Sequence, residues 1–86
     1  MGIEFDATKD EVNRAKHGVS LSRASDIDVL VRVTDARFAE PRLRAYGLID
    51  GEAYCLAYTL RNGVVRAISL RRAHAKEMRR HVSRKG

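Results

Sequence analysis

The fold is decided by residues 43–70, which read LRAYGLIDGEAYCLAYTLRNGVVRAISL. The dipeptides Asp50-Gly51 and Asn62-Gly63 divide this stretch into three largely apolar segments. Both dipeptides are typical of two-residue β-hairpin turns, because their residues tolerate the positive φ that a type I′ turn requires. The sequence therefore predicts three consecutive antiparallel strands, over residues 43–49, 53–60 and 64–70. The middle strand is apolar on both faces, which is typical of a strand in the centre of a sheet.

Upstream of this stretch the pattern predicts one more strand. Val29, Val31 and Val33 occupy alternate positions, as in a strand with one face partly buried. Residues 35–41 contain the only proline, Pro41, and are expected to form a loop. The segment Ile3-Glu4-Phe5 is short and extended in character, and is a possible minor strand at the N-terminus.

Three helices are expected around these strands. Asp6 can cap a first helix that ends at His17-Gly18, with Val12 and Ala15 as a thin apolar stripe. Ser20 can cap a short second helix that runs to about residue 26 and buries Leu21 and Ala24. A final helix is expected over residues 73–83. The predicted fold class is α+β: a four-stranded antiparallel meander, with or without the minor N-terminal strand, together with two N-terminal helices and one C-terminal helix.

Length and composition exclude several classes of protein. A chain of 86 residues with 44% hydrophobic and 33% charged residues fits a single domain over residues 1–86 with one modest core. No apolar run is long enough to cross a membrane, and residues 1–6 do not resemble a signal peptide. The single cysteine, Cys55, can form neither an internal disulfide nor a cysteine-rich zinc site. We therefore expect a cytoplasmic protein that is neither a membrane protein, a disulfide scaffold nor a multidomain enzyme.

The net charge of +6 is concentrated near the C-terminus. Residues 1–62 carry nine Lys and Arg against ten Asp and Glu, whereas residues 63–86 carry eight against one, a net of +7. Such asymmetry indicates a polyanionic partner, either a nucleic acid or an acidic protein. The alternative is a solvated basic helix that only aids solubility.

Arginines stand inside the last predicted strand. Strict alternation places one set of residues on one face and a second set on the other: Arg66, Ile68, Leu70 and Arg72 against Val65, Ala67, Ser69 and Arg71. An arginine within a sheet either meets a carboxylate, lines a groove that binds an anion, or reaches solvent at the strand end. Several arginines around one sheet favour the phosphate-binding groove.

The final helix combines a basic face with titratable residues. Helical spacing places Ala75, Met78 and Val82 on one stripe, Lys76, Arg79, Arg80 and Ser83 opposite, and His74, Glu77 and His81 along the border. These three border residues can supply a general acid and base or form a weak metal site. The alternative is that they only mark the border between the polar and apolar sides of an amphipathic helix. His17, at the end of the first helix, is either a cap that favours the helix dipole or a further proton-transfer group.

Four segments, taken together, resemble the BrnT family of type II toxins. They are Phe5-Asp6-x-x-Lys9-x-x-x-Asn13-x-x-Lys16-His17-Gly18-Val19-Ser20, Arg42-x-x-x-x-Gly47, Tyr58-Thr59-x-Arg61, and Arg66-x-Ile68-Ser69-x-Arg71-Arg72-Ala73-x-x-x-Glu77. They occur in order and span nearly the whole chain. The resemblance implies a RelE-like fold, with helices on one side of a small antiparallel sheet and a basic groove on the other. It also implies an endoribonuclease that inhibits translation by cleaving RNA without a metal or other cofactor.

The resemblance further implies a division of roles. Cleavage by 2′-OH attack needs a base, an acid, and cations that stabilise the dianionic transition state. The candidate catalytic residues are Lys9, His17, Arg61, Arg66, Arg71, Glu77 and His81, with Glu77, His17 and His81 considered first as acid or base. The candidate RNA-binding residues are Arg42, Arg72, Arg79 and Arg80.

The family also implies a partner. This partner is a BrnA-like antitoxin of ribbon-helix-helix type, which would neutralise the toxin in a two-plus-two heterotetramer. The complex would contact operator DNA only through the antitoxin. Two other functions remain open from the sequence. One is a non-catalytic RNA- or protein-binding module on the same fold, and the other is a structural subunit that joins antitoxin dimers.

Overall fold

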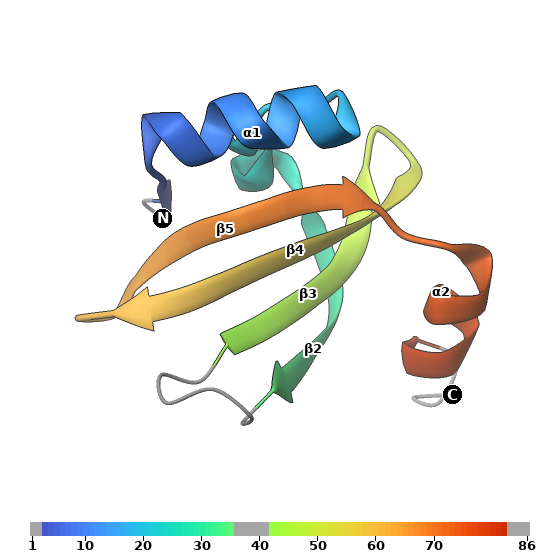
Figure 1. Cartoon of the computed structure of the whole chain (residues 1–86). Helices are drawn as coiled ribbons and strands as arrows, with labels where there is room; N and C mark the ends of the chain where they lie inside the picture. Colours follow the sequence, from blue (N-terminus) through green and yellow to red (C-terminus); the bar gives the residue numbers. More distant parts are fainter. Residues whose placement is uncertain (1–2, 36–41, 83–86) are drawn as a thin grey trace.

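The computed structural model describes residues 3–35 and 42–82 (Figure 1). The expected loop at residues 36–41, with Pro41, lies outside the described residues. The elements in chain order are β1 (Ile3–Glu4), α1 (Ala7–His17), the 3₁₀ helix η1 (Leu21–Asp26), β2 (Asp28–Asp35), β3 (Arg42–Ile49), β4 (Glu52–Arg61), β5 (Val64–Arg72) and α2 (Ala75–His81).

One five-stranded sheet organises the described residues, in the order β1-β5-β4-β3-β2. The predicted meander is confirmed: β2, β3, β4 and β5 pair antiparallel in sequence order, with β4 in the centre. Both turns adopt the predicted backbone, since Asp50 and Asn62 have φ of 51° and 52° and the glycines that follow also have positive φ. The sheet is nevertheless mixed rather than purely antiparallel, because β1 pairs parallel with β5.

The N-terminal helices begin and end where the capping residues predict. The Asp6 carboxylate accepts a hydrogen bond from the Thr8 N–H at 2.7 Å, and Gly18 takes the left-handed conformation with φ 71°. The expected apolar stripe of α1 is wrong, however. Val12 is 50% exposed, and the buried residue of α1 is Asn13, whose side chain binds the backbone of β5.

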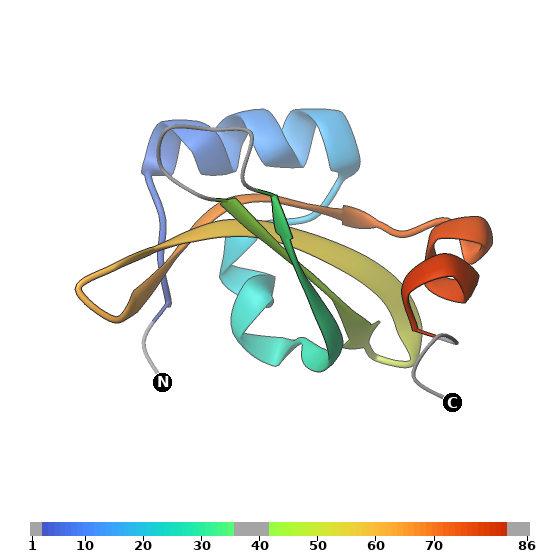
Figure 2. The ribbon, with the colours of Figure 1, turned by 90° about the horizontal axis from the view of Figure 1, so that it is seen from below.

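The hydrophobic core lies on one side of the sheet, which we call the core face. There η1 buries Leu21 and Ala24 against residues of the central strands such as Leu56 and Leu70. Seen edge-on, α1 and η1 lie on opposite sides of the sheet (Figure 2). The expectation that all helices share one side is therefore wrong, because α1 borders the opposite face, which we call the groove face.

A β-bulge in β5 changes the face of the sheet on which its arginines lie. Opposite β4, Ala57 pairs with Ser69 but Tyr58 pairs with Ala67, so Ile68 is an extra residue in β5. The bulge shifts the alternation by one position, and Ala67 and Leu70 both enter the core. Arg66 and Arg71 consequently share the groove face, whereas strict alternation had placed them on opposite faces. Arg72 lies on the core face, where it pairs with Tyr54 of β4.

The last helix is shorter than expected and packs differently. It spans Ala75–His81, Ala75 is exposed, and none of the helix residues is fully buried. The side that faces the sheet carries Glu77 and His81, which were predicted to lie at the border of the apolar stripe. Met78 and Val82 of the predicted stripe are half-buried, so α2 is held at the end of the groove face by these residues together with the Glu77 ion pair and the His81 stack.

Candidate nucleic-acid interface

Two adjoining hollows on the groove face gather cationic side chains from four elements. One, of about 240 Å³, is lined by Lys9 of α1, Arg42 of β3, Arg61 of β4 and Arg66 of β5, beside Thr59. The second, of about 400 Å³, is lined by Lys9, Lys16 and His17 of α1 and by Ser69 and Arg71 of β5. The hollows share Lys9 and Ile68, so they form one continuous feature. We call this feature the basic groove. Its cationic and histidine side chains are Lys9, Lys16, His17, Arg42, Arg61, Arg66 and Arg71.

Lys9, Lys16 and Arg66 supply accessible positive charge to the basic groove. Arg66 pairs with Glu4 of β1 at 3.1 Å, and both side chains are more than one-third exposed. An exposed pair of this kind contributes little and exchanges readily for another anion. Lys9 and Lys16 form no ion pair with any of the described residues. The groove therefore presents a positive surface that a phosphate backbone can neutralise.

Glu77 closes the α2 end of the basic groove and binds Arg71. Arg71 donates two hydrogen bonds to the Glu77 carboxylate, Nη1 to Oε1 and Nη2 to Oε2, each at 2.8 Å. The His74 backbone N–H donates to Oε1 at 3.0 Å, and the Tyr46 hydroxyl donates to Oε2 at 3.4 Å. The hydrogen bonds from Arg71 are the main reason that the pKa of Glu77 falls to about 2. The same pair raises the pKa of Arg71, so both groups stay charged across the physiological range.

Tyr46 connects this ion pair to His81. Its side chain is fully buried, and its ring stacks on the His81 imidazole with centroids 4.7 Å apart and an interplanar angle of 18°. Arg44 donates from Nη1 to the Tyr46 hydroxyl at 3.0 Å, while Arg44 Nε is buried with no partner among the described residues. Burial is the main cause that raises the pKa of Tyr46 to about 12, so its hydroxyl stays protonated and can donate to Glu77.

Sequence reasoning missed Arg44 and Tyr46, although a signal was present. Both alternate with Leu43 and Ala45 in β3, so they had to lie together on the face opposite the core. An arginine inside a strand needs either a partner or a groove, and this holds for Arg44 as it does for Arg66. Lys16, which was quoted only as part of the opening signature, also lines the basic groove.

The predicted site residues divide into those at the basic groove and those away from it. The groove is lined by Lys9, His17, Arg42, Arg61, Arg66 and Arg71, and Glu77 and His81 lie beside its Arg71 end. Arg72 is on the other face, where its guanidinium lies over the Tyr54 ring at 5.5 Å and pairs with Glu52. Arg79 and Arg80 are exposed on α2 and line neither hollow.

Neither a cluster of metal ligands nor a membrane-spanning helix is found within the residues that the structure describes. The carboxylate of the border cluster His74, Glu77 and His81 is engaged by Arg71, and residues 3–35 and 42–82 contain no group of three or more His, Cys, Asp or Glu side chains placed to hold a metal ion. Among these residues, none of the helices has the length and hydropathy needed to cross a bilayer.

The fold and the groove together define a small α+β domain with a cationic groove walled by its first helix, a class suited to binding a polyanion. Comparison with known proteins identifies the family. Residues 5–77 match the family model described as the ribonuclease toxin, BrnT, of type II toxin–antitoxin systems. The chain belongs to this BrnT family. The 1.1 Å crystal structure of the Brucella abortus ribonuclease toxin BrnT is similar, with a TM-score of 0.68 and 26% sequence identity over 86% of this chain and 97% of that one. A search of curated proteins found no match.

Proposed function

We propose that this chain is an endoribonuclease toxin that inhibits translation by cleaving RNA in the basic groove. Membership of the BrnT family supports a ribonuclease of a toxin–antitoxin pair. The observation that carries the proposal is the convergence of Lys9, Arg42, Arg61 and Arg66, from four different elements, on one hollow. Preorganised cations bind a phosphate backbone and also stabilise the charge that develops when a 2′-OH attacks the neighbouring phosphate.

In this proposal Arg71 contacts the scissile phosphate and Glu77 positions Arg71. Arg71 lines the groove while both of its terminal nitrogens are held by the Glu77 carboxylate. Glu77 is poorly suited to be the general base that the sequence suggested. Its oxygens already accept hydrogen bonds, and a carboxylate with a pKa of about 2 is a weak base near neutral pH.

Proton transfer is assigned to the histidines. His17 lines the same hollow as Arg71 and Lys9, so its ring can reach a substrate bound there. His81 stacks on Tyr46 beside Glu77 and is the second candidate. An imidazole nitrogen can accept or donate a proton, which suits both removal of the 2′-OH proton and protonation of the leaving 5′-oxygen.

The test is cleavage of a synthetic single-stranded RNA by the purified chain in the presence of EDTA. We expect products with a 2′,3′-cyclic phosphate or 3′-phosphate and a 5′-hydroxyl, because the nucleophile is the adjacent 2′-OH. Lys9→Ala and Arg66→Ala should abolish most cleavage, whereas Arg72→Ala on the core face should not. Products with 5′-phosphates, or activity lost on chelation, would contradict this mechanism.

The ion pair between Glu77 and Arg71 favours a second candidate function, RNA binding without cleavage. Because the Glu77 carboxylate is occupied by Arg71, and none of the described residues that line the two hollows is acidic, the groove would also serve a non-catalytic RNA-binding module. RNA binding by the wild-type chain without cleavage, with the same dependence on Lys9 and Arg66, would support this alternative.

We further propose a cytoplasmic complex with a protein antitoxin. Type II systems pair the toxin with such a protein, and membership of the family implies the partner. The expected antitoxin is a BrnA-like ribbon-helix-helix protein in a two-plus-two heterotetramer, with operator DNA bound through the antitoxin. Co-purification of this chain with the product of an adjacent gene, and the mass of the complex, test this expectation.

A further inference from the structure

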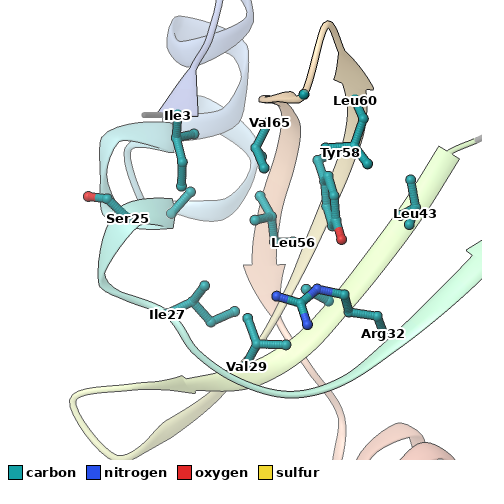
Figure 3. Close-up of a pocket in the computed structure, with 13 residues that line it drawn as sticks. Ile3, Ser25, Ile27, Val29, Arg32, Leu43, Leu56, Tyr58, Leu60 and Val65 are labelled. Atoms are coloured by element: carbon teal, nitrogen blue, oxygen red, sulfur yellow. The ribbon is translucent and has the colours of Figure 1, made fainter. Parts of the chain in front are cut away.

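The core face of the sheet is only partly covered by the described residues. The single element packed on it is η1, six residues long, which buries one end of the face. The rest forms an apolar pocket of about 380 Å³ between η1, the lead-in to β2 and the sheet (Figure 3). Its walls include Ile27, Leu43, Leu56 and Val65, and at its edge Leu60 is 49% exposed. This volume is within the range of ligand-binding pockets.

Besides Ser25, the exposed Arg32 and the buried Tyr58 bring polar atoms to the wall of this mostly apolar pocket. Arg32 reaches in from β2, and the hydroxyl end of Tyr58 is directed towards the side where the Arg32 guanidinium lies (Figure 3). Within the described part of the chain, Arg32 forms no ion pair and the Tyr58 hydroxyl forms no hydrogen bond. A cation and a hydroxyl at one side of an apolar pocket suit a carboxylate attached to an apolar group.

The pocket adjoins an uncovered sheet edge. β2 is the last strand of the sheet and pairs with β3 on one side only, so its eight residues present an unpaired backbone edge among the residues described. The strand reads Asp-Val-Leu-Val-Arg-Val-Thr-Asp and contains no Pro; its charged residues are Asp28, Arg32 and Asp35, and Leu30, at a register shift in the pairing with β3, is 39% exposed. Native proteins usually protect such an edge, and an extended segment of a partner can cover it by adding a strand.

We propose that the apolar pocket and the β2 edge together bind an extended segment of the protein antitoxin, with an apolar side chain in the pocket and a carboxylate against Arg32. The proposal rests on the proposed toxin function, because it takes the antitoxin as the occupant. Charge complementarity favours this occupant over a second copy of the chain, since the net charge of +6 opposes self-association and the Arg32 guanidinium at the pocket attracts a carboxylate of the partner. The apolar pocket lies on the face opposite the basic groove, so this docking site is distinct from the proposed RNA site.

The experiment measures binding of the protein encoded by the adjacent antitoxin gene to purified variants of this chain. Leu60→Asp and Arg32→Glu should each weaken binding by about tenfold or more, as expected when a buried anchor or a paired charge is removed. The matched controls are Val64→Asp, which alters another partly exposed apolar residue outside the pocket, and Lys76→Glu, which reverses an exposed charge on α2. Thermal melts establish that each variant is folded.

A second readout does not depend on substitutions. In the complex, backbone amides of residues 28–35 that do not pair with β3 should become protected from hydrogen exchange. If the wild-type chain binds the antitoxin but both pocket variants bind it equally well, this proposal is wrong. The same holds if binding does not protect β2 from exchange. In either case the expected partnership with the antitoxin would stand. No binding by the wild-type chain would overturn the expected partnership and this proposal with it. A dimer of the isolated chain that Arg32→Glu disrupts would identify a second copy as the occupant instead.

Discussion

The Asn13 side chain forms two hydrogen bonds with the backbone of Leu70: Nδ2 donates to the carbonyl oxygen at 2.9 Å, and Oδ1 accepts from the N–H at 3.0 Å. β1 covers the outer edge of β5 only as far as the pairing of Glu4 with Arg66. Beyond that point Asn13 takes the place of a neighbouring strand. Because it lies on α1, the same contact holds one wall of the basic groove against the strand that carries Arg66 and Arg71.

Asn13→Ala should lower the free energy of unfolding by about 2–4 kcal/mol, because it leaves two buried backbone groups of Leu70 without partners. Chemical denaturation measures the change. Val12→Ala is the control, since Val12 is half exposed in the same turn and should change stability by no more than about 0.5 kcal/mol. Equal effects of the two substitutions would show that the Asn13 contact contributes nothing specific.

Glu77→Gln should loosen α2 and reduce stability by about 1 kcal/mol at neutral pH, because it removes the charge that binds Arg71. The pKa of Glu77 is about 2 in the folded chain against an ordinary value of 4.5, so its contribution is complete above pH 4.5 and is lost as the pH falls towards 2. The difference between wild type and Glu77→Gln should therefore disappear over that interval. The control is Glu52→Gln, which removes an exposed partner of Arg72 and should have little effect. A difference that persists at pH 2 would argue against the ion pair as its source.

Lys9→Ala and Arg66→Ala should each weaken RNA binding and lower the slope of log K against log salt by about one, because each removes one phosphate contact. Fluorescence anisotropy with a labelled oligonucleotide across a salt series measures both quantities. Arg72→Ala removes the same charge from the core face and should leave affinity and slope nearly unchanged. If all three substitutions act alike, the binding depends on net charge and not on the basic groove.

His17→Ala should reduce the cleavage rate by about 100-fold or more with little change in RNA affinity, the pattern expected of a proton-transfer group. His81→Ala should also loosen α2, since it removes the stack on Tyr46. Single-turnover cleavage and a binding titration separate the two effects. A full rate with His17→Ala and a large loss with His81→Ala would transfer the proton-transfer role to His81.

Gly47→Ala should destabilise the sheet, because an added Cβ would lie 2.2 Å from the backbone oxygen of Asp28 in β2. The neighbouring backbone must move, and a loss of about 1–3 kcal/mol is expected. Thermal unfolding measures it, with Ala57→Ser, on the groove face of β4, as a mild reference substitution. A wild-type melting temperature for Gly47→Ala would mean that β2 can shift at this point without cost.

The local structure of this protein could be predicted from short stretches of its sequence. The turns at Asp50-Gly51 and Asn62-Gly63, and the caps at Asp6 and Ser20, depend on residues close together in the chain, and all of them occur as predicted. The central position of β4 also followed from its pattern, because a strand that is apolar on both faces must be covered on both. The family followed from four short motifs whose order and spacing are visible in the sequence.

Which side chains contact one another depends on how elements distant in the sequence pack together. The bulge at Ile68 depends on the pairing of β5 with β4, and it moves Arg66 and Arg71 to one face against strict alternation. The burial of Asn13 follows from the shortness of β1, which leaves the backbone of Leu70 to be paired by a side chain. Periodicity within one segment carries no information on such long-range contacts, because they are set by how neighbouring strands and helices pack. The basic groove therefore contains most of the predicted cations, while the exclusion of Arg72 and the parts taken by Arg44 and Tyr46 required the assembled sheet.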